Sequence, residues 1–177
     1  MIADRLDIVG LLLIEAEKYC DQRGFFNCVW DNNILHEGKP IITPSSVNFS
    51  YNKHVNTLRG MHFQKDPYSQ KKMVTCVSGR IYDVVVDLRK SSPSYRKWVG
   101  LEMDSNQGVS LLIPKGCAHG FLTLEENSIV SYIIEGNYIS TASMTLLWND
   151  PVIGIQWPVK SPFISKKDAE SPSFDCI

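Results

Sequence analysis

The chain lacks a long hydrophobic run, which argues against a membrane-spanning segment. Its only apolar stretch near the N-terminus, Ile8 to Ile14, is too short to cross a bilayer. Charged residues precede that stretch and no small-residue cleavage site follows it, so it is a poor match to a secretory signal peptide. We therefore expect a cytoplasmic protein without a membrane partner.

An excess of either charge is also absent. The sequence has 18 Lys and Arg against 19 Asp and Glu, for a net charge of -1 at pH 7. This balance gives no overall attraction to nucleic acid or to an anionic membrane. A pocket needs only two or three basic groups to bind a phosphorylated small molecule, so such a ligand stays compatible with the composition.

The five cysteines form no CxxC pair, which removes the usual zinc and thioredoxin-like signatures. Their odd number and scattered placement suit free thiols in a reducing compartment. Helical periodicity is scarce as well. Only the segment Lys166 to Glu170, near the C-terminus, is expected to form a short helix.

Short β-rich runs separated by turn residues are what the sequence does contain. Their spacing is regular and typical of a sandwich or barrel. We predict one all-β domain over residues 1–177, closed or double-sheeted so that its edges are protected. The close spacing around Ser78 and Gly79 predicts a hairpin between the first two runs. The predicted strands are 73–78, 81–88, 97–103, 109–113, 120–124 and 128–134.

Two histidines, His62 and His119, each follow a glycine turn that leads into an apolar strand. A single histidine in such a setting is more often structural, but two with cations nearby favour a site. An imidazole titrating near neutral pH is a natural general base and needs a carboxylate to orient it. Spacing does not choose among the candidate carboxylates, which are Asp83, Asp87, Asp150 and Asp168.

A catalytic metal would need three or four converging ligands. The position where a His-x-His pair would stand reads His62-Phe63-Gln64, and glutamine is a poor ligand for iron, zinc or nickel. We therefore expect no catalytic metal.

Four further residues could take part in chemistry, each with an ordinary structural alternative. Tyr132 is either an acid opposite the base or a core aromatic, and Lys72 either polarises a carbonyl or starts a solvated strand. Arg23 and Arg59 each border a glycine. They could reach a phosphate, or be exposed surface arginines.

Nine motifs stand in an order that is specific as a set. They resemble the dTDP-4-dehydrorhamnose 3,5-epimerase family over roughly residues 8–168. The motifs are Asp21–Phe26, Leu58–Gln64, Gln70–Val74, Tyr82–Arg89, Ser91–Ser94, Trp98–Gly100, Ile113–Leu122, Trp148–Pro151 and Ser165–Asp168.

This resemblance implies a cupin jelly roll with short C-terminal helical segments, a homodimer, and no metal or cofactor. It also implies an epimerase that inverts C3, C5 or both in a nucleotide-diphosphate-linked 4-keto-6-deoxy sugar, in deoxysugar or polysaccharide biosynthesis. The catalytic residues would be His62 as base, Asp168 as its carboxylate, Lys72 near the C4 oxygen and Tyr132 as proton donor. Substrate binding would fall to Arg23, Phe26, Asn48, Ser50, Arg59, Gln64, His119, Tyr138 and Lys167.

The sequence departs from the family pattern between residues 136 and 147, and at Ser46, where the family usually has Gln. These segments are associated with recognition of the nucleotide base and the sugar. Our hypothesis is that the reaction is retained while the carrier, dTDP, GDP or CDP, stays open, as does a hexose or heptose. The competing interpretations are a metal-dependent cupin, a ketoisomerase, and a non-catalytic sugar-nucleotide binding module.

Overall fold

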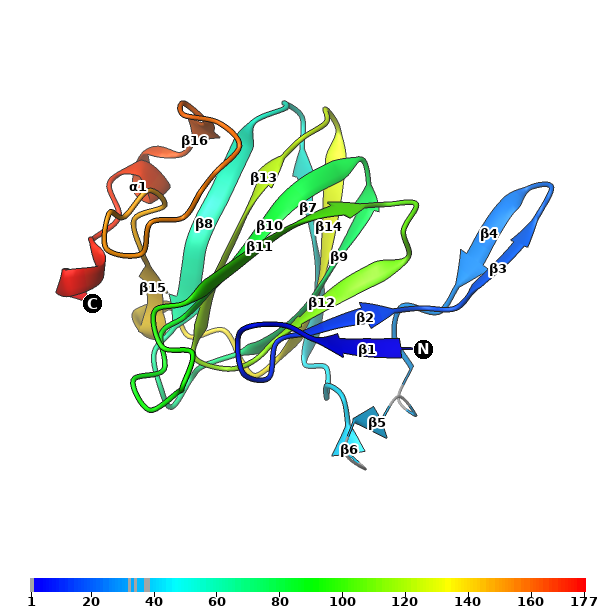
Figure 1. The fold of residues 1–177 in the computed structure, drawn as a ribbon, viewed down its shortest axis with the longest axis horizontal. Helices are drawn as coiled ribbons and strands as arrows, with labels where there is room; N and C mark the ends of the chain where they lie inside the picture. Colours follow the sequence, from blue (N-terminus) through cyan, green and yellow to red (C-terminus); the bar gives the residue numbers. More distant parts are fainter. Residues whose placement is uncertain (1, 32, 34, 37–38) are drawn as a thin grey trace.

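Two six-stranded sheets face each other and enclose the main core (Figure 1). The structure is a computed structural model that describes residues 2–31, 33, 35–36 and 39–177. The first sheet has the order β1 (Ile2–Arg5), β2 (Leu12–Glu15), β12 (Val109–Ile113), β9 (Lys71–Ser78), β14 (Ser128–Glu135) and β7 (Ser46–Asn52). The second has the order β11 (Trp98–Asp104), β10 (Arg80–Asp87), β13 (Cys117–Thr123), β8 (Thr57–Gln64) and β15 (Ser143–Thr145), and β16 (Phe163–Ile164) pairs parallel to β8.

Smaller elements flank the two sheets. One hairpin, β3 (Lys18–Asp21) and β4 (Gly24–Asn27), extends away from the sandwich, and a shorter one consists of β5 (Leu35–His36) and β6 (Lys39–Pro40) (Figure 1). The helices in the described residues are α1 (Lys166–Ala169) and two 3-10 turns, Ser140–Ala142 and Phe174–Cys176. None of these has the length and apolar character that crossing a membrane would need.

The core between the sheets is built from inward-facing alternate residues. Val74 and Val130 of the first sheet pack with Val85 and Phe121 of the second, and all four are almost completely buried. A second cluster buries Val84 and Val86 on the outer face of the second sheet, under residues of the C-terminal segment. Because both faces of β10 are covered, its segment Val84–Val86 is apolar on both faces rather than alternating.

The all-β architecture predicted from the sequence is confirmed and takes the double-sheeted form, and β9 to β14 overlap the six predicted strands. The predicted hairpin at Ser78 and Gly79 is wrong. Here β9 pairs with β12 and β14, whereas β10 pairs with β11 and β13. The chain therefore crosses from the first sheet to the second at this point.

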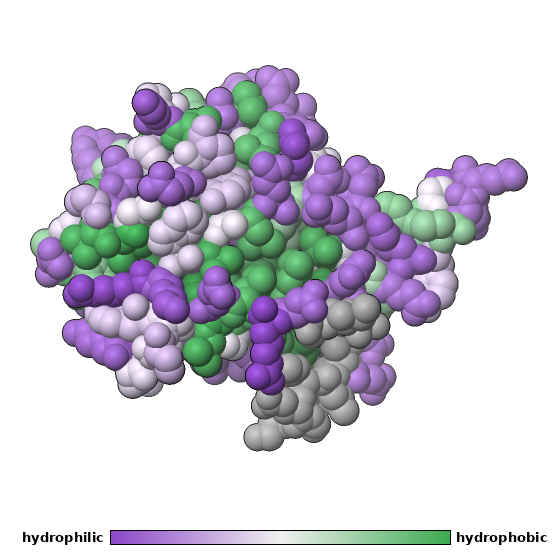
Figure 2. Space-filling model, in the orientation of Figure 1, coloured by the Kyte–Doolittle hydropathy of each residue, from purple (hydrophilic) through white to green (hydrophobic). Residues whose placement is uncertain are grey.

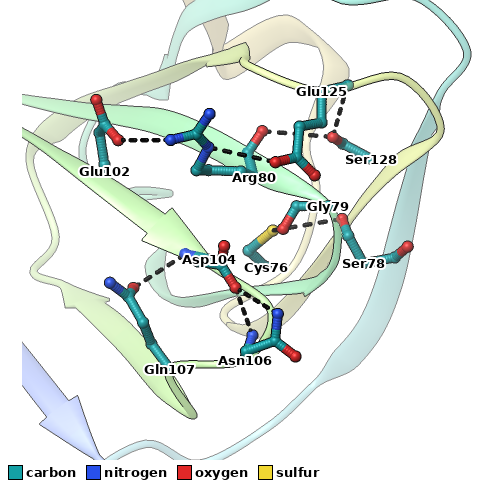
Figure 3. Close-up of polar contacts among 10 residues, drawn as sticks. All are labelled: Cys76, Ser78, Gly79, Arg80, Glu102, Asp104, Asn106, Gln107, Glu125 and Ser128. Carbon is teal, nitrogen blue, oxygen red and sulfur yellow. Dashed lines mark hydrogen bonds and ion pairs between the residues drawn. The ribbon is translucent and has the colours of Figure 1, made fainter.

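Glycine is required at this crossing because of its backbone and its neighbours (Figure 3). Gly79 has φ +74°, and a Cβ placed there would lie 2.4 Å from the hydroxyl of Ser128. Just beyond it, the side chain of Arg80 forms ion pairs of 3.4 Å with Glu102 and with Glu125. These contacts close the end of the sandwich around the crossing.

The predicted C-terminal helix is present as α1. It begins after Ser165, whose hydroxyl accepts a hydrogen bond from the backbone N–H of Asp168 at 3.1 Å. An N-cap of this kind satisfies one of the free N–H groups at the start of a helix. The cap also sets the position of Asp168, the one residue of α1 that is buried.

Candidate active site

A cavity of about 400 Å³ opens between the two sheets, lined mainly by polar side chains. The first sheet contributes Asn48, Lys72 and Tyr132 from three adjacent strands, since Asn48 and Tyr132 are paired positions and Tyr132 also pairs with Val74. The second sheet contributes Arg59 and His62. The full lining is Asn48, Arg59, His62, Phe63, Gln64, Gln70, Lys72, His119, Tyr132, Ile134, Tyr138, Ser143 and Lys167.

A bulge in β8 brings Arg59 and His62 to the same cavity. His62 is opposite His119 on β13 while Arg59 is opposite Phe121, so β8 carries one more residue than its partner. An extra residue resets the alternation of side chains, which otherwise places positions three apart on opposite faces. The bulge requires Gly60, because φ there is +137° and a Cβ would lie 2.5 Å from the Cα of Gly120.

His62 pairs with Asp168, as the resemblance implied. The imidazole Nε2 lies 2.8 Å from Oδ1 of Asp168, and the other carboxylate oxygen accepts a 3.3 Å hydrogen bond from the N–H of Gly60. The His62 side chain is 43% exposed and that of Asp168 only 7%. The imidazole is thus open to the cavity on one side and held by a buried carboxylate on the other.

Burial lowers the pKa of His62, while the hydrogen bond and charge of Asp168 act to raise it. The nearby charges of Lys72 and His119 add to the lowering. The net direction is downward, so His62 is neutral near pH 7 and is able to accept a proton. A base in that state, with a carboxylate ready to stabilise its protonated form, matches the requirement for general-base chemistry.

His119 forms a second histidine–carboxylate pair that the sequence did not predict. Its Nε2 lies 2.9 Å from the carboxylate of Asp83, and the two side chains are 4% and 0% exposed. Its ring packs against that of Tyr132 in a T-shaped arrangement, with 5.9 Å between the ring centroids. Asp83 had been one of four candidate partners for His62, and its position in an otherwise apolar strand was the available signal.

Burial shifts the pKa values of Lys72 and Tyr132 in opposite directions. Burial lowers the pKa of Lys72 to about 8, against the opposing charge of Asp83. Burial raises the pKa of the Tyr132 hydroxyl, and Asp83 raises it further. At neutral pH the cavity therefore holds a cationic amine and a protonated phenol facing a neutral imidazole.

Most of the remaining predicted binding residues lie around the cavity or close to it. The Nε of Arg59 donates to Oδ1 of Asn52 on β7 at 2.7 Å, and Arg59 lines the cavity together with Asn48 of the same strand. Ser50 is on β7 two positions from Asn48 and is half-buried, but does not line the cavity itself. Tyr138 and Lys167 lie at the cavity, and Tyr138 is 68% exposed.

Arg23 and Phe26 are not brought to the cavity of their own chain. Both belong to the β3–β4 hairpin, which stands apart from the body of the molecule (Figures 1 and 2). The Arg23 side chain is 90% exposed and pairs with Asp21, and Phe26 is 71% exposed. Within one chain, therefore, neither residue contacts the space where a substrate would bind.

Four lining residues were missed by sequence reasoning: Phe63, Gln70, Ile134 and Ser143. Gln70 had a usable signal, because it is two residues before Lys72 and strand alternation places both on one face. Ser143 had none, since it reaches the cavity through pairing of β15 with β8. In the described part of the chain, no group of three or more His, Cys, Asp or Glu side chains is arranged to hold a metal ion.

Comparison with known proteins finds the same family as the sequence motifs, over nearly the whole chain. A family model described as dTDP-4-dehydrorhamnose 3,5-epimerase matches residues 5–175. A relative of that name from Sinorhizobium fredii is 37% identical, covering 98% of this chain and 89% of the relative.

Solved structures agree with this. A dTDP-4-dehydrorhamnose 3,5-epimerase from Bacillus anthracis, with TDP and PPi bound, superposes with a TM-score of 0.90 at 36% identity over 97% of this chain and 98% of its own. A 3'-monoepimerase from Streptomyces bikiniensis, in complex with dTDP-quinovose, gives 0.87 at 28% identity over 95% and 85%. The expected cupin-like jelly roll is thereby confirmed. The chain belongs to the dTDP-4-dehydrorhamnose 3,5-epimerase family and is an isomerase.

Proposed function

We propose that this protein epimerises a dTDP-linked 4-keto-6-deoxy sugar at C3, C5 or both, through an enolate. The observation that carries the proposal is the His62–Asp168 pair, which faces a cavity that also contains Lys72 and Tyr132. A base, a cation and a proton donor around one cavity are the three groups that this reaction needs. A non-catalytic binding module would not need these three groups together.

The chemistry follows from the charges in the cavity. A hydrogen next to the C4 ketone becomes acidic enough to remove only if the resulting enolate oxygen is stabilised. The ammonium of Lys72 supplies a fixed positive charge for that oxygen in a site shielded from water. His62 takes the proton, and Tyr132 returns one to the opposite face, which inverts the carbon. Because C3 and C5 both flank C4, one set of residues is able to act on either centre.

The choice of dTDP as carrier is supported by the relatives, whose names or bound ligands include TDP or dTDP-sugars. The number of centres stays open, because the structural relatives include both a 3,5-epimerase and a 3'-monoepimerase. Segment 136–147 and Ser46, which depart from the family pattern, border the cavity or the adjoining hollow that contains Ser46 and Asn137. If the carrier or sugar differs from that of the relatives, we expect these residues to determine the difference.

Deuterium incorporation tests the proposal directly. The protein is incubated in D2O with dTDP- and GDP-linked 4-keto-6-deoxyglucose in separate reactions, and uptake is followed by NMR and mass spectrometry. We expect exchange at C3, C5 or both with the dTDP sugar, and its loss in His62→Asn. Faster exchange with the GDP sugar would reassign the carrier. Absence of exchange with either sugar, in folded protein, would reject epimerisation.

We further propose that the protein is a homodimer that uses the outward face of β7. This strand forms one edge of the first sheet. Its outward residues Val47, Phe49 and Tyr51 are 58%, 70% and 56% exposed. Long edge strands with exposed apolar side chains are usually covered in native proteins. A second copy would cover this face and receive the β3–β4 hairpin.

Light scattering after size exclusion measures this association. We expect the wild type to have twice the chain mass of 20.0 kDa and Phe49→Asp to shift toward a single chain. The matched control is Phe163→Asp, on β16, where a similarly exposed phenylalanine (64%) lies on the other sheet. A monomeric wild type, or an equal loss of mass in the control, would contradict the proposed face.

A further inference from the structure

Gln64 directs its whole side-chain amide at the protein rather than at the cavity that it lines. Its Nε2 donates to the carbonyls of Tyr68 at 2.7 Å and Asn137 at 3.0 Å. Its Oε1 accepts from the N–H of Ile139 at 2.7 Å. A glutamine amide has two N–H donors, and both are in use. With only 6% of the residue exposed, no donor is left for a substrate.

Two of these three bonds flank Tyr138, one residue before it and one residue after. A carbonyl and an N–H that both turn toward one partner form the same pattern as a rung between β-strands. Here the partner is a side chain instead of a second strand. We call residues Gly136–Ile139 the pocket cover. Tyr138, at its centre, lines the catalytic cavity and the adjoining hollow.

The pocket cover has further hydrogen bonds at both of its end residues, and at Ile139 the carbonyl accepts from the N–H of Ala142 at 3.0 Å. The carbonyl of Gly136 accepts from Nε2 of Gln70 at 3.1 Å and from the hydroxyl of Ser45 at 2.9 Å. Beyond the cover, the N–H of Lys65 donates to the carbonyl of Ala142. Among these contacts, the hydrogen bonds from Gln64 join the backbone on both sides of Tyr138 to β8, the strand that carries His62.

We propose that Gln64 is a positioning residue that fixes Tyr138 at the mouth of the catalytic cavity. It follows His62 by two residues on β8, so the strand that carries the base also holds the pocket cover. This inference rests on the proposed function for its catalytic consequence. Its structural part, the hold on residues 137–139, does not depend on which sugar is bound.

The variant Gln64→Met tests the role, because methionine keeps an unbranched chain of similar length without amide groups. Binding would then have to order the pocket cover, while the His62–Asp168 pair stays in place. We expect KM to rise about tenfold with kcat within about twofold, the pattern of lost binding rather than lost chemistry. Gln107→Met is the matched control, since its Oε1 also accepts a backbone N–H, that of Asp104 (Figure 3), but Gln107 is not among the residues that line the cavity.

A double-variant cycle separates positioning from direct contact. If Gln64 acts through Tyr138, then Gln64→Met adds little to KM in a Tyr138→Ala background. If the two effects on KM multiply, or if kcat falls as much as kcat/KM, Gln64 acts on the substrate itself and the proposal is wrong.

Amide hydrogen exchange gives an answer that needs no turnover. In Gln64→Met we expect the N–H of Ile139 to exchange at least tenfold faster, while the amides of β14 keep wild-type protection. Unchanged exchange at Ile139 would overturn the proposal. If the wild type fails to turn over the dTDP sugar, the function proposed above fails, and exchange alone then decides the role of Gln64.

Discussion

The two histidine–carboxylate pairs differ in one property, their access to the cavity. His62 and His119 are directly opposite each other on β8 and β13. The His119–Asp83 pair is almost completely buried, whereas the His62 ring is 43% exposed in front of a buried Asp168. Both rings line the cavity, and the more exposed ring of His62 is the better placed to exchange a proton with a bound ligand. The buried pair instead packs against Tyr132 and sets the charge around it and Lys72.

Replacing Asp168 by Asn should separate its two effects on His62. Its carboxylate raises the pKa of the imidazole against burial, so its loss lowers that pKa further. His62 works as the neutral form, and activity is lost as pH falls through its pKa. The acid limb of kcat/KM against pH should therefore move to lower pH. The plateau should fall about a hundredfold to ten-thousandfold, because the protonated base loses its counter-charge.

Asp150→Asn is the comparison for this experiment. Asp150 is as buried as Asp168, but it accepts hydrogen bonds from the backbone at Val152, Ile153 and Phe174. For Asp150→Asn we expect the acid limb of kcat/KM against pH to stay at its wild-type position. A limb that moves to higher pH in Asp168→Asn would show that the carboxylate does not hold His62 as described.

At the scale of single residues, the sequence alone predicted the reactive side chains but not the carboxylates that pair with them. His62 and Asp168 are 106 positions apart, and spacing alone left four carboxylates equivalent. Resemblance to a family chose Asp168, and the structure places it beside His62. Nothing local connects His119 to Asp83, because their contact depends on β10 and β13 being neighbours. Contacts between residues on neighbouring strands cannot be predicted until the strand order is known.

Among the connecting elements, the turn after β10 is held by one buried carboxylate. Asp87 accepts from the guanidinium of Arg89 at 2.8 Å and from the hydroxyls of Ser92 and Ser94 at 2.6 and 2.7 Å. The same turn anchors the N-terminal segment, since Ser94 accepts from the N–H of Val9 and Arg89 donates to its carbonyl. Asp87 therefore stabilises two segments that are distant in sequence.

Asp87→Asn should lower the free energy of unfolding by about 3 kcal/mol, the scale for breaking a buried ion pair. Burial acts to raise the pKa of Asp87, but hydrogen bonds from Arg89, Ser92 and Ser94 outweigh it and hold that pKa below its usual value. A depressed pKa adds stability above the unfolded value of about 3.9, which is lost as pH falls below it. Urea unfolding at pH 7 and pH 3 checks this, and a deficit no smaller at pH 3 would contradict it.

Strand positions were predictable because apolar runs and turn residues are local signals. Strand partners were not, and the hairpin expected at Gly79 shows why. A glycine turn between two β-rich runs is equally compatible with a hairpin and with a crossing between facing sheets. The N-terminal strands β1 to β7 were not predicted. The edge strand β7 was missed although its outward residues Val47, Phe49 and Tyr51 alternate with the polar residues Asn48, Ser50 and Asn52.

For the whole molecule, the β3–β4 hairpin is the main feature that one chain does not explain. It carries Arg23 and Phe26, which family resemblance assigns to substrate binding, away from the cavity of its own chain. An exposed phenylalanine and arginine at the end of a protruding hairpin are suited to contact another chain. A dimer in which each hairpin completes the partner's cavity would reconcile the assignment with the fold.

Mixing two inactive variants tests that arrangement. In a mixed dimer of Arg23→Ala and His62→Asn chains, the cavity with an intact His62 would receive the intact Arg23 of the partner. After random exchange of subunits, an equal mixture should recover about a quarter of wild-type activity, because half of the dimers are mixed and each has one complete site. No recovery, with subunit exchange verified by mass spectrometry, would place Arg23 outside the partner's cavity.

The buried amine of Lys72 also makes the cavity a target for selective chemical labelling. With a pKa of about 8, roughly half of the Lys72 side chains are uncharged and nucleophilic at pH 8. A lysine with the ordinary value of about 10.4 is uncharged only about once in 250 molecules at that pH. A small acylating reagent that fits the cavity should therefore modify Lys72 ahead of the surface lysines. A ligand already bound in the cavity would block the reagent. The extent of acylation at Lys72 would therefore record whether the cavity was occupied.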